Sequence, residues 1–229
     1  MDELIYWIIS AIAYFFIILS ITFGFKNLRD KHRAFHKFLL ALLIVSLASD
    51  LASLISIYAM QLANYPILHT YTIVEFTLLT LLYRSVFQNG HLKKAVLLCI
   101  VAFFVFKLFD LLFVTSIYKA DTTTVITESL IMIVLSVLYF GQLIVRNDIK
   151  LTQFPMFYIN SAILFYFSGS FLLFLYGTYI YEEASTYYVY WCIHNVLLVI
   201  RNVLFLVAMV LLGRPEASYI RKDELIAHE

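Results

Sequence analysis

Long apolar runs separated by short polar stretches dominate this chain. A membrane-spanning helix needs about 20 mostly apolar residues, because the hydrocarbon core of a bilayer is about 30 Å thick and the backbone must satisfy its own hydrogen bonds there. Prolines at the start of two runs and a Gly-Arg-Pro after the last run mark helix boundaries. The pattern predicts seven spans, at Leu4–Phe23, Phe38–Met60, Pro66–Phe87, Ala95–Ser116, Thr124–Val145, Pro155–Gly177 and Tyr187–Leu212.

The composition agrees with a membrane protein. The 229 residues are 63% hydrophobic and 14% charged, with a mean hydropathy of +0.90, whereas soluble domains are far more polar. Both cysteines fall inside apolar runs, so we expect free thiols. The first run follows Met-Asp-Glu and lacks a cleavage site, so we expect it to be retained. We predict an all-α, seven-transmembrane-helix bundle over residues 1–213 and a short tail over residues 214–229.

The basic residues are distributed asymmetrically. Thirteen of the 16 lysines and arginines lie in or beside the connections after the first, third, fifth and seventh spans, and the opposite connections hold only Lys119. The positive-inside rule therefore predicts an inner-membrane protein with its N-terminus outside and its C-terminus in the cytoplasm. A net charge of +1 gives no reason to expect a nucleic-acid partner. Because the connections are short, we expect function within the bundle or through a cytoplasmic or membrane partner.

The last span carries four polar side chains in two adjacent pairs seven residues apart. His194 and Arg201 share one helical stripe, and Asn195 and Asn202 share the next. An arginine near the bilayer centre costs about 2.5–3.5 kcal/mol on insertion scales, so this face should point into the bundle.

Further charges lie inside the other predicted spans. The acids Asp50, Glu75, Asp110 and Glu128 oppose Lys107 and Arg201, and buried charges must be paired or neutralised. Lys107 and Asp110 are three residues apart and can pair locally on one helix. Arg201 matches Asp50 in depth. We therefore predict a buried ion-pair core, comprising Asp50, Lys107, Asp110, Arg201 and Asn202.

A polar stripe also enters the third span, where His69, Thr72 and Glu75 recur every three residues. At similar depth lie Glu128 and the polar pair of the last span. We predict an outward-facing pocket that binds a small molecule or ion, with the ligand-binding set His69, Thr72, Glu75, Glu128, His194 and Asn195.

Each of these signals also has a structural interpretation. An arginine–acid pair can simply fix helix register, a lone histidine is often a hydrogen-bonded core residue, and serine or threonine stripes hold helices together. The sequence contains neither His-Glu-x-x-His nor Cys-x-x-Cys, so no metal site and no cofactor are predicted. The lysine of a retinal protein and the signature motifs of G-protein-coupled receptors are also absent.

The function favoured by this pattern is a receptor-like or sensory module that binds a small ligand and signals through a partner. The alternative is a small transporter coupled to protons or cations, which the surplus of acids favours. A weak hairpin repeat around Asp50 and Asp110 also supports it. The third and least favoured interpretation is an intramembrane hydrolase that pairs Ser168 or Ser170 with His194. Its serine motif lacks the preceding glycine.

Overall fold

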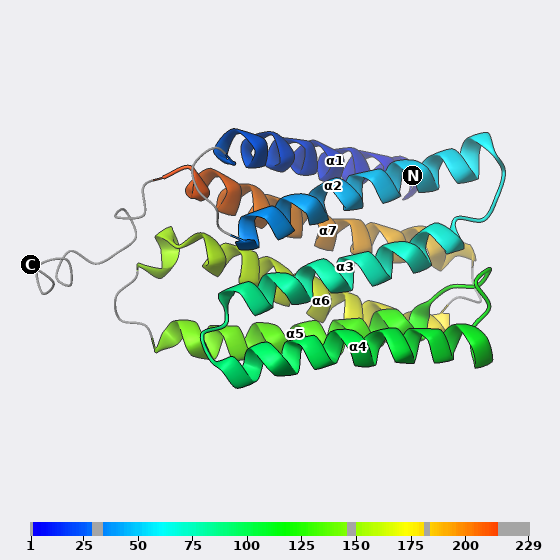
Figure 1. The fold of residues 1–229 in the computed structure, drawn as a ribbon. Coiled ribbons are helices and arrows are strands. Elements are labelled where there is room, and N and C mark those ends of the chain that lie inside the picture. The colour runs from blue at the N-terminus through cyan, green and yellow to red at the C-terminus, as the bar shows by residue number, and fades with distance from the viewer. Residues whose placement is uncertain (1, 29–33, 146–149, 181–183, 215–229) are drawn as a thin grey trace, which may run out of the picture. The chain divides into compact units, whose positions relative to one another are not determined.

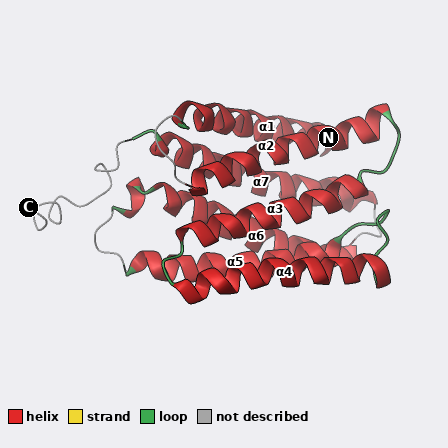
Figure 2. Cartoon of the chain, viewed as in Figure 1, coloured by secondary structure: helices red, strands yellow, loops and turns green. Residues whose placement is uncertain are grey.

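The computed structural model describes residues 2–28, 34–145, 150–180 and 184–214, and within these ranges it is all-helical (Figures 1 and 2). Seven long α-helices are described, together with a π-helical turn and a short 3-10 turn. In chain order they are α1 (Asp2–Asn27), α2 (Ala34–Leu54), η1 (Ile55–Ala59), α3 (Tyr65–Val86), α4 (Gly90–Phe113), α5 (Thr122–Ile144), η2 (Leu151–Gln153), α6 (Pro155–Ile180) and α7 (Ala184–Leu212).

Six of these helices are long and apolar enough to cross a membrane, which indicates a multi-pass membrane protein. The helix outside this group is α3, which has the required length but carries many polar side chains. The seventh span therefore stays a prediction, as does the orientation of the termini. Helices suit this environment because every mid-helix N–H and C=O bonds within its own segment.

The contacts between helices divide the chain into two compact units. Unit 1 comprises Met1–Lys31 and Leu130–Glu229, and unit 2 comprises His32–Ser129. Helix α5 begins in unit 2 and continues into unit 1. Each unit is described separately below.

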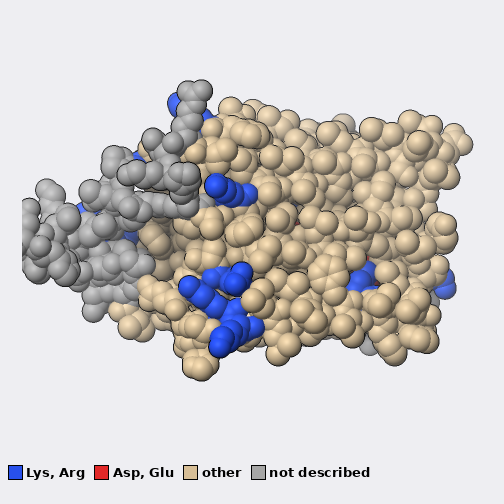
Figure 3. All heavy atoms as spheres, viewed as in Figure 1, with Lys and Arg blue, Asp and Glu red and all other residues tan. Residues whose placement is uncertain are grey.

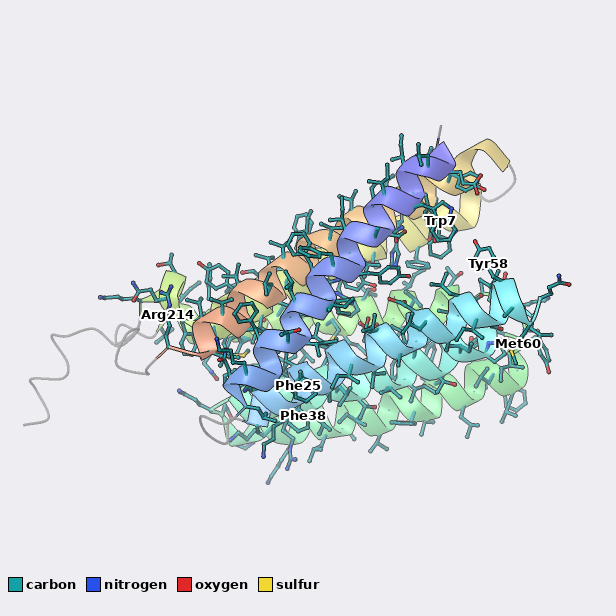
Figure 4. The ribbon with its side chains drawn as sticks, turned by 90° about the horizontal axis from the view of Figure 1, so that it is seen from above. Trp7, Phe25, Phe38, Tyr58, Met60 and Arg214 are labelled. Atoms are coloured by element: carbon teal, nitrogen blue, oxygen red, sulfur yellow. The ribbon has the colours of Figure 1, made fainter. Side chains whose placement is uncertain are left out.

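In unit 2, α3 packs against α2 on one side and α4 on the other (Figure 1). The side chain of Asn89 caps α4 by accepting a hydrogen bond from the N–H of His91 at 2.8 Å, which satisfies a donor left over at the helix start. At the far end of α2 the chain widens into the π-helical turn, where Tyr58 and Met60 are exposed (Figure 4). The apolar core of this unit is formed by α2, α3 and α4.

In unit 1, α7 packs against both α1 and α6. The approach of α6 to α7 is close at Gly169, where an added Cβ would lie 2.6 Å from Cδ2 of Leu197. Small residues allow such close helix packing in membranes, where apolar burial contributes little to helix association.

The predicted spans coincide with the observed helices except at their ends. The largest difference is in α4, which begins at Gly90 rather than Ala95 because Asn89 provides the cap. Lys93 and Lys94 therefore lie in the helix, and the prediction that they lie in the preceding connection is wrong. On the visible face, basic side chains gather where α3 ends and α4 begins (Figure 3).

Candidate functional site

The strongest concentration of buried polar groups lies in unit 2, at the end where α3 begins and α4 finishes. We call this group the polar cluster: His69 of α3, Lys107 of α4, Asp121 of the connection before α5, and Thr124 in the first turn of α5. All four side chains are buried. His69 and Lys107 lie on helices α3 and α4, whereas Asp121 lies at the end of a non-helical connection.

Lys107 is the centre of the polar cluster. Its side chain is 1% exposed, and its ammonium group contacts three acceptors. Nζ lies 2.7 Å from Nδ1 of His69, 3.3 Å from Oγ1 of Thr124, and within ion-pair distance of Oδ2 of Asp121. An ammonium group has three N–H donors, so the three contacts account for all of them. Lysines are rarely buried so completely without a partner, and Asp121 supplies that partner.

The second ring nitrogen of His69 defines the tautomer. Nε2 lies 3.1 Å from the carbonyl oxygen of Lys119, and because a carbonyl oxygen can only accept, Nε2 carries the proton. In the neutral ring Nδ1 then accepts from Lys107. The same Nδ1 lies 3.0 Å from Oδ2 of Asp121, so the imidazole and the carboxylate share the ammonium group. The connection over residues 114–121 is thus attached to the helices by Lys119 and by Asp121.

Asp121 is incompletely satisfied by these contacts. Its Oδ1 atom is buried and has no hydrogen-bond partner among the described residues. Leaving a buried acceptor without a donor costs about 1–3 kcal/mol. The ion pair therefore combines a fully engaged ammonium group with a half-engaged carboxylate.

The stripe predicted along α3 forms a buried face, and its role in binding a ligand stays a prediction. Thr72 and Glu75 follow His69 at three-residue intervals and are buried. The Tyr71 hydroxyl donates to Oε1 of Glu75 at 2.8 Å and lies 3.2 Å from the Ser46 hydroxyl of α2. Glu75 therefore takes part in a hydrogen-bonded group that joins α3 to α2.

An aromatic pair lies next to the polar cluster along α3 and α4. Phe76 of α3 and Phe103 of α4 are stacked with ring centroids 3.8 Å apart and rings inclined by 15°. Both rings are buried. Phe76 follows His69 by about two helical turns and Phe103 precedes Lys107 by about one, so the pair lies deeper along both helices. Next to it in sequence are Leu79 and Leu82, which are also buried.

The expected local pair between Lys107 and Asp110 is not formed. Lys107 bonds to Asp121 instead, and Asp110 accepts from the hydroxyl of Thr115 at 3.2 Å. The reason is geometric: Asp121 follows the end of α4 and returns to Lys107 from the adjoining connection. Oδ2 of Asp110 is buried and has no hydrogen-bond partner among the described residues.

In unit 1 the asparagines of α7 hold the helix to α1. Asn195 donates to the hydroxyl of Ser10 at 2.7 Å, and Asn202 donates to the carbonyl of Ala13 at 3.1 Å. The Ser20 hydroxyl lies 3.4 Å from the carbonyl of Asn202. Both asparagines of the predicted stripe therefore face α1, and their hydrogen bonds hold the two helices together. Asn195, which we expected to contact a ligand, is engaged by Ser10.

The other stripe of α7 faces aromatic rings. The guanidinium of Arg201 lies 4.4 Å from the ring centroid of Tyr166 and 5.9 Å from that of Phe205, within the range of cation–π attraction. His194 lies 5.6–6.0 Å from three aromatic rings, those of Tyr166, Phe174 and Trp191.

The serine–histidine pair of a hydrolase is not formed in unit 1. Nδ1 of His194 and the hydroxyl of Ser170 are buried and have no hydrogen-bond partner among the described residues. Nucleophilic activation of a serine requires a base within hydrogen-bonding reach.

Two groupings expected from the sequence join residues of different units and stay predictions. These are the pair of Arg201 with Asp50, and the convergence of His194 and Asn195 on the α3 stripe. Glu128, also in the expected ligand set, is buried in α5.

Asp121 was not predicted from the sequence as a member of the site. It precedes three threonines at the start of the fifth predicted span, a pattern typical of a helix N-cap. From that position the Asp121 side chain reaches Lys107.

Among the described residues, no group of three or more His, Cys, Asp or Glu side chains is placed to hold a metal ion. In comparisons with known proteins, no family model, no curated protein and no solved structure matches this chain. The function is therefore argued from the polar cluster and its surroundings.

Proposed function

We propose that this protein is a receptor-like or sensory module of the inner membrane, which binds a small ligand at the polar end of unit 2 and signals through a partner. The positive-inside topology supports this assignment. With the N-terminus outside, α3 begins and α4 finishes at the outer surface, so a ligand would reach the polar cluster from outside.

The observation that carries the proposal is a buried charged cluster at one end of the unit, with the stacked Phe76 and Phe103 deeper along the same helices. Ionisable groups inside membrane proteins are costly and commonly functional. We take a polar site that is followed by stacked aromatic rings to favour binding over passage through the membrane.

Signalling in such a module requires two states that bind the ligand differently. The connection over residues 114–121 is a suitable moving part, because Asp121 and the carbonyl of Lys119 attach it to Lys107 and His69. A ligand that engages the polar cluster would alter these attachments and shift the connection.

The test uses the full chain in lipid nanodiscs and in sealed vesicles. A library of small metabolites is screened for thermal stabilisation in nanodiscs, and each compound that stabilises the protein is tested for solute and proton flux in vesicles. We expect stabilisation that Glu75→Gln or His69→Ala weakens at least about tenfold in apparent Kd, with no flux. Glu3→Gln, at an exposed position on α1, is the matched control and should leave binding unchanged.

A proton- or cation-coupled transporter is the second candidate. It is supported by the buried acids of unit 2, namely Glu75, Asp110, Asp121 and Glu128, of which Asp121 is paired with Lys107. This function requires Phe76 and Phe103 to part during transport. Flux that is driven by a solute and abolished by Glu75→Gln would establish the transporter and end the receptor proposal.

A further inference from the structure

We propose that the ligand of the polar cluster is a small carboxylate, and that Asp121 occupies its place in the unliganded protein. This inference rests on the function proposed above and names the chemical class of its ligand. It predicts that the carboxylate of the ligand displaces Asp121 from Lys107 and bonds to Nζ of Lys107 and Oγ1 of Thr124.

The first step of the argument is the local charge. Lys107 is the one lysine that is buried among the described residues, and Thr124 lies in the first turn of the 23-residue helix α5. The N-terminus of a long helix carries unsatisfied N–H donors and a partial positive charge. Ammonium, hydroxyl and helix N-terminus together make a position that favours an anion.

The second step is the way in which Asp121 fills that position. Its Oδ2 atom is the acceptor for Lys107, but its Oδ1 atom is buried and unpartnered. Asp121 therefore leaves part of its hydrogen-bonding capacity unused. A free carboxylate can orient both oxygens toward the available donors, which the attached side chain does not achieve.

The third step is the position of the two charged groups in the secondary structure. Lys107 and His69 lie on helices of 24 and 22 residues, whereas Asp121 ends a non-helical connection. The cation is thus held within a helix, whereas the anion is held just before the start of α5. Replacement of Asp121 by a ligand carboxylate conserves the charge around Lys107, so the exchange avoids burying an additional net charge.

The experiment measures binding of potassium acetate to the full chain in nanodiscs, at constant pH and ionic strength. Acetamide is the uncharged analogue of the same shape, and potassium chloride is the control for anions in general. We expect acetate to stabilise the wild-type protein, with acetamide and chloride inactive at equal concentration.

Two substitutions should change acetate binding in opposite directions. Asp121→Asn removes the competing carboxylate. If Asp121 occupies Lys107 for more than about 90% of the time, the apparent Kd should fall at least about tenfold. Lys107→Met should abolish binding, and Lys94→Met, which removes an exposed lysine from the same helix, should leave it unchanged. The gain expected for Asp121→Asn cannot arise from misfolding.

Amide hydrogen exchange provides a second readout. Acetate should increase exchange over residues 114–121 in the wild-type protein, because displacement of Asp121 frees the connection. Equal effects of acetate and acetamide, equal effects of acetate and chloride, or an unchanged Kd in Asp121→Asn would each overturn the inference. A cationic or neutral ligand that depends on Glu75 and not on Lys107 would also overturn it, while leaving the receptor function in place.

Discussion

The ion pair between Lys107 and Asp121 provides the most direct test of how unit 2 is stabilised. Replacing Lys107 with methionine keeps the volume and length of the side chain but removes the charge. The Asp121 carboxylate would then be buried beside His69 and Thr124 without a cation. Breaking a buried ion pair by removing one partner costs about 3–5 kcal/mol. The cost should lie within this range because both side chains are more than nine-tenths buried.

The double substitution measures the interaction energy between Lys107 and Asp121 apart from the effect of each side chain alone. Asp121→Leu alone leaves an unpaired ammonium group, which should also destabilise the fold. In Lys107→Met/Asp121→Leu no charge remains, and replacing a buried pair with apolar side chains is often close to neutral. We expect the double variant to be more stable than Lys107→Met by at least about 1.5 kcal/mol, a coupling within the range found for contacting residues.

The assay is unfolding in mixed micelles of increasing SDS mole fraction, followed by far-ultraviolet circular dichroism. Lys119→Met is the control, since its side chain is exposed at the same end of the unit, and its free energy of unfolding should change by less than about 0.5 kcal/mol. Additive effects of the two single substitutions, or a cost below about 1 kcal/mol for Lys107→Met, would refute the assignment of Asp121 as the partner.

Two further predictions concern unit 1, and the same unfolding assay checks both. Gly169→Ala should destabilise the fold by about 1–3 kcal/mol, because the new methyl group would lie 2.6 Å from Leu197. Gly141→Ala has open space around the new methyl group and should be neutral or stabilising by up to about 1 kcal/mol; equal effects at both glycines would contradict close packing of α6 on α7. Asn202→Leu should cost about 0.6–2 kcal/mol through the lost hydrogen bond to α1. The control is Thr22→Val, because the exposed hydroxyl of Thr22 bonds within its own helix, and it should change the free energy of unfolding by less than about 0.5 kcal/mol. If Thr22→Val cost as much as Asn202→Leu, the hydrogen bond between α1 and α7 would contribute nothing to stability.

Sequence patterns predicted the positions of the helices well because the length and hydropathy of a run are local properties of the chain. Length and hydropathy define a span, so the positions of α1, α2, α5, α6 and α7 follow from the apolar runs. The start of α4 was predicted too late because a capping asparagine can extend a helix into a polar, lysine-bearing stretch. Such a cap depends on the side-chain geometry of Asn89, which hydropathy does not contain.

The candidate site was predicted in part. The periodicity of α3 placed His69, Thr72 and Glu75 on one face, and that face is buried. The partner of Lys107 was predicted incorrectly, because helical spacing identifies Asp110 as a neighbour but takes no account of a connection that folds back. Asp121 lies 14 residues from Lys107, and sequence separation alone carries no information about that contact.

The sequence by itself therefore determined the class of the protein, its helices and the faces that must avoid lipid, since each of these follows from the cost of placing polar groups in hydrocarbon. Tertiary structure alone decided which charges meet. The number of donors on one ammonium group, the position of a non-helical connection and the stacking of two phenylalanine rings depend on packing between helices. Those contacts turn a set of buried polar residues into a cluster with a defined centre.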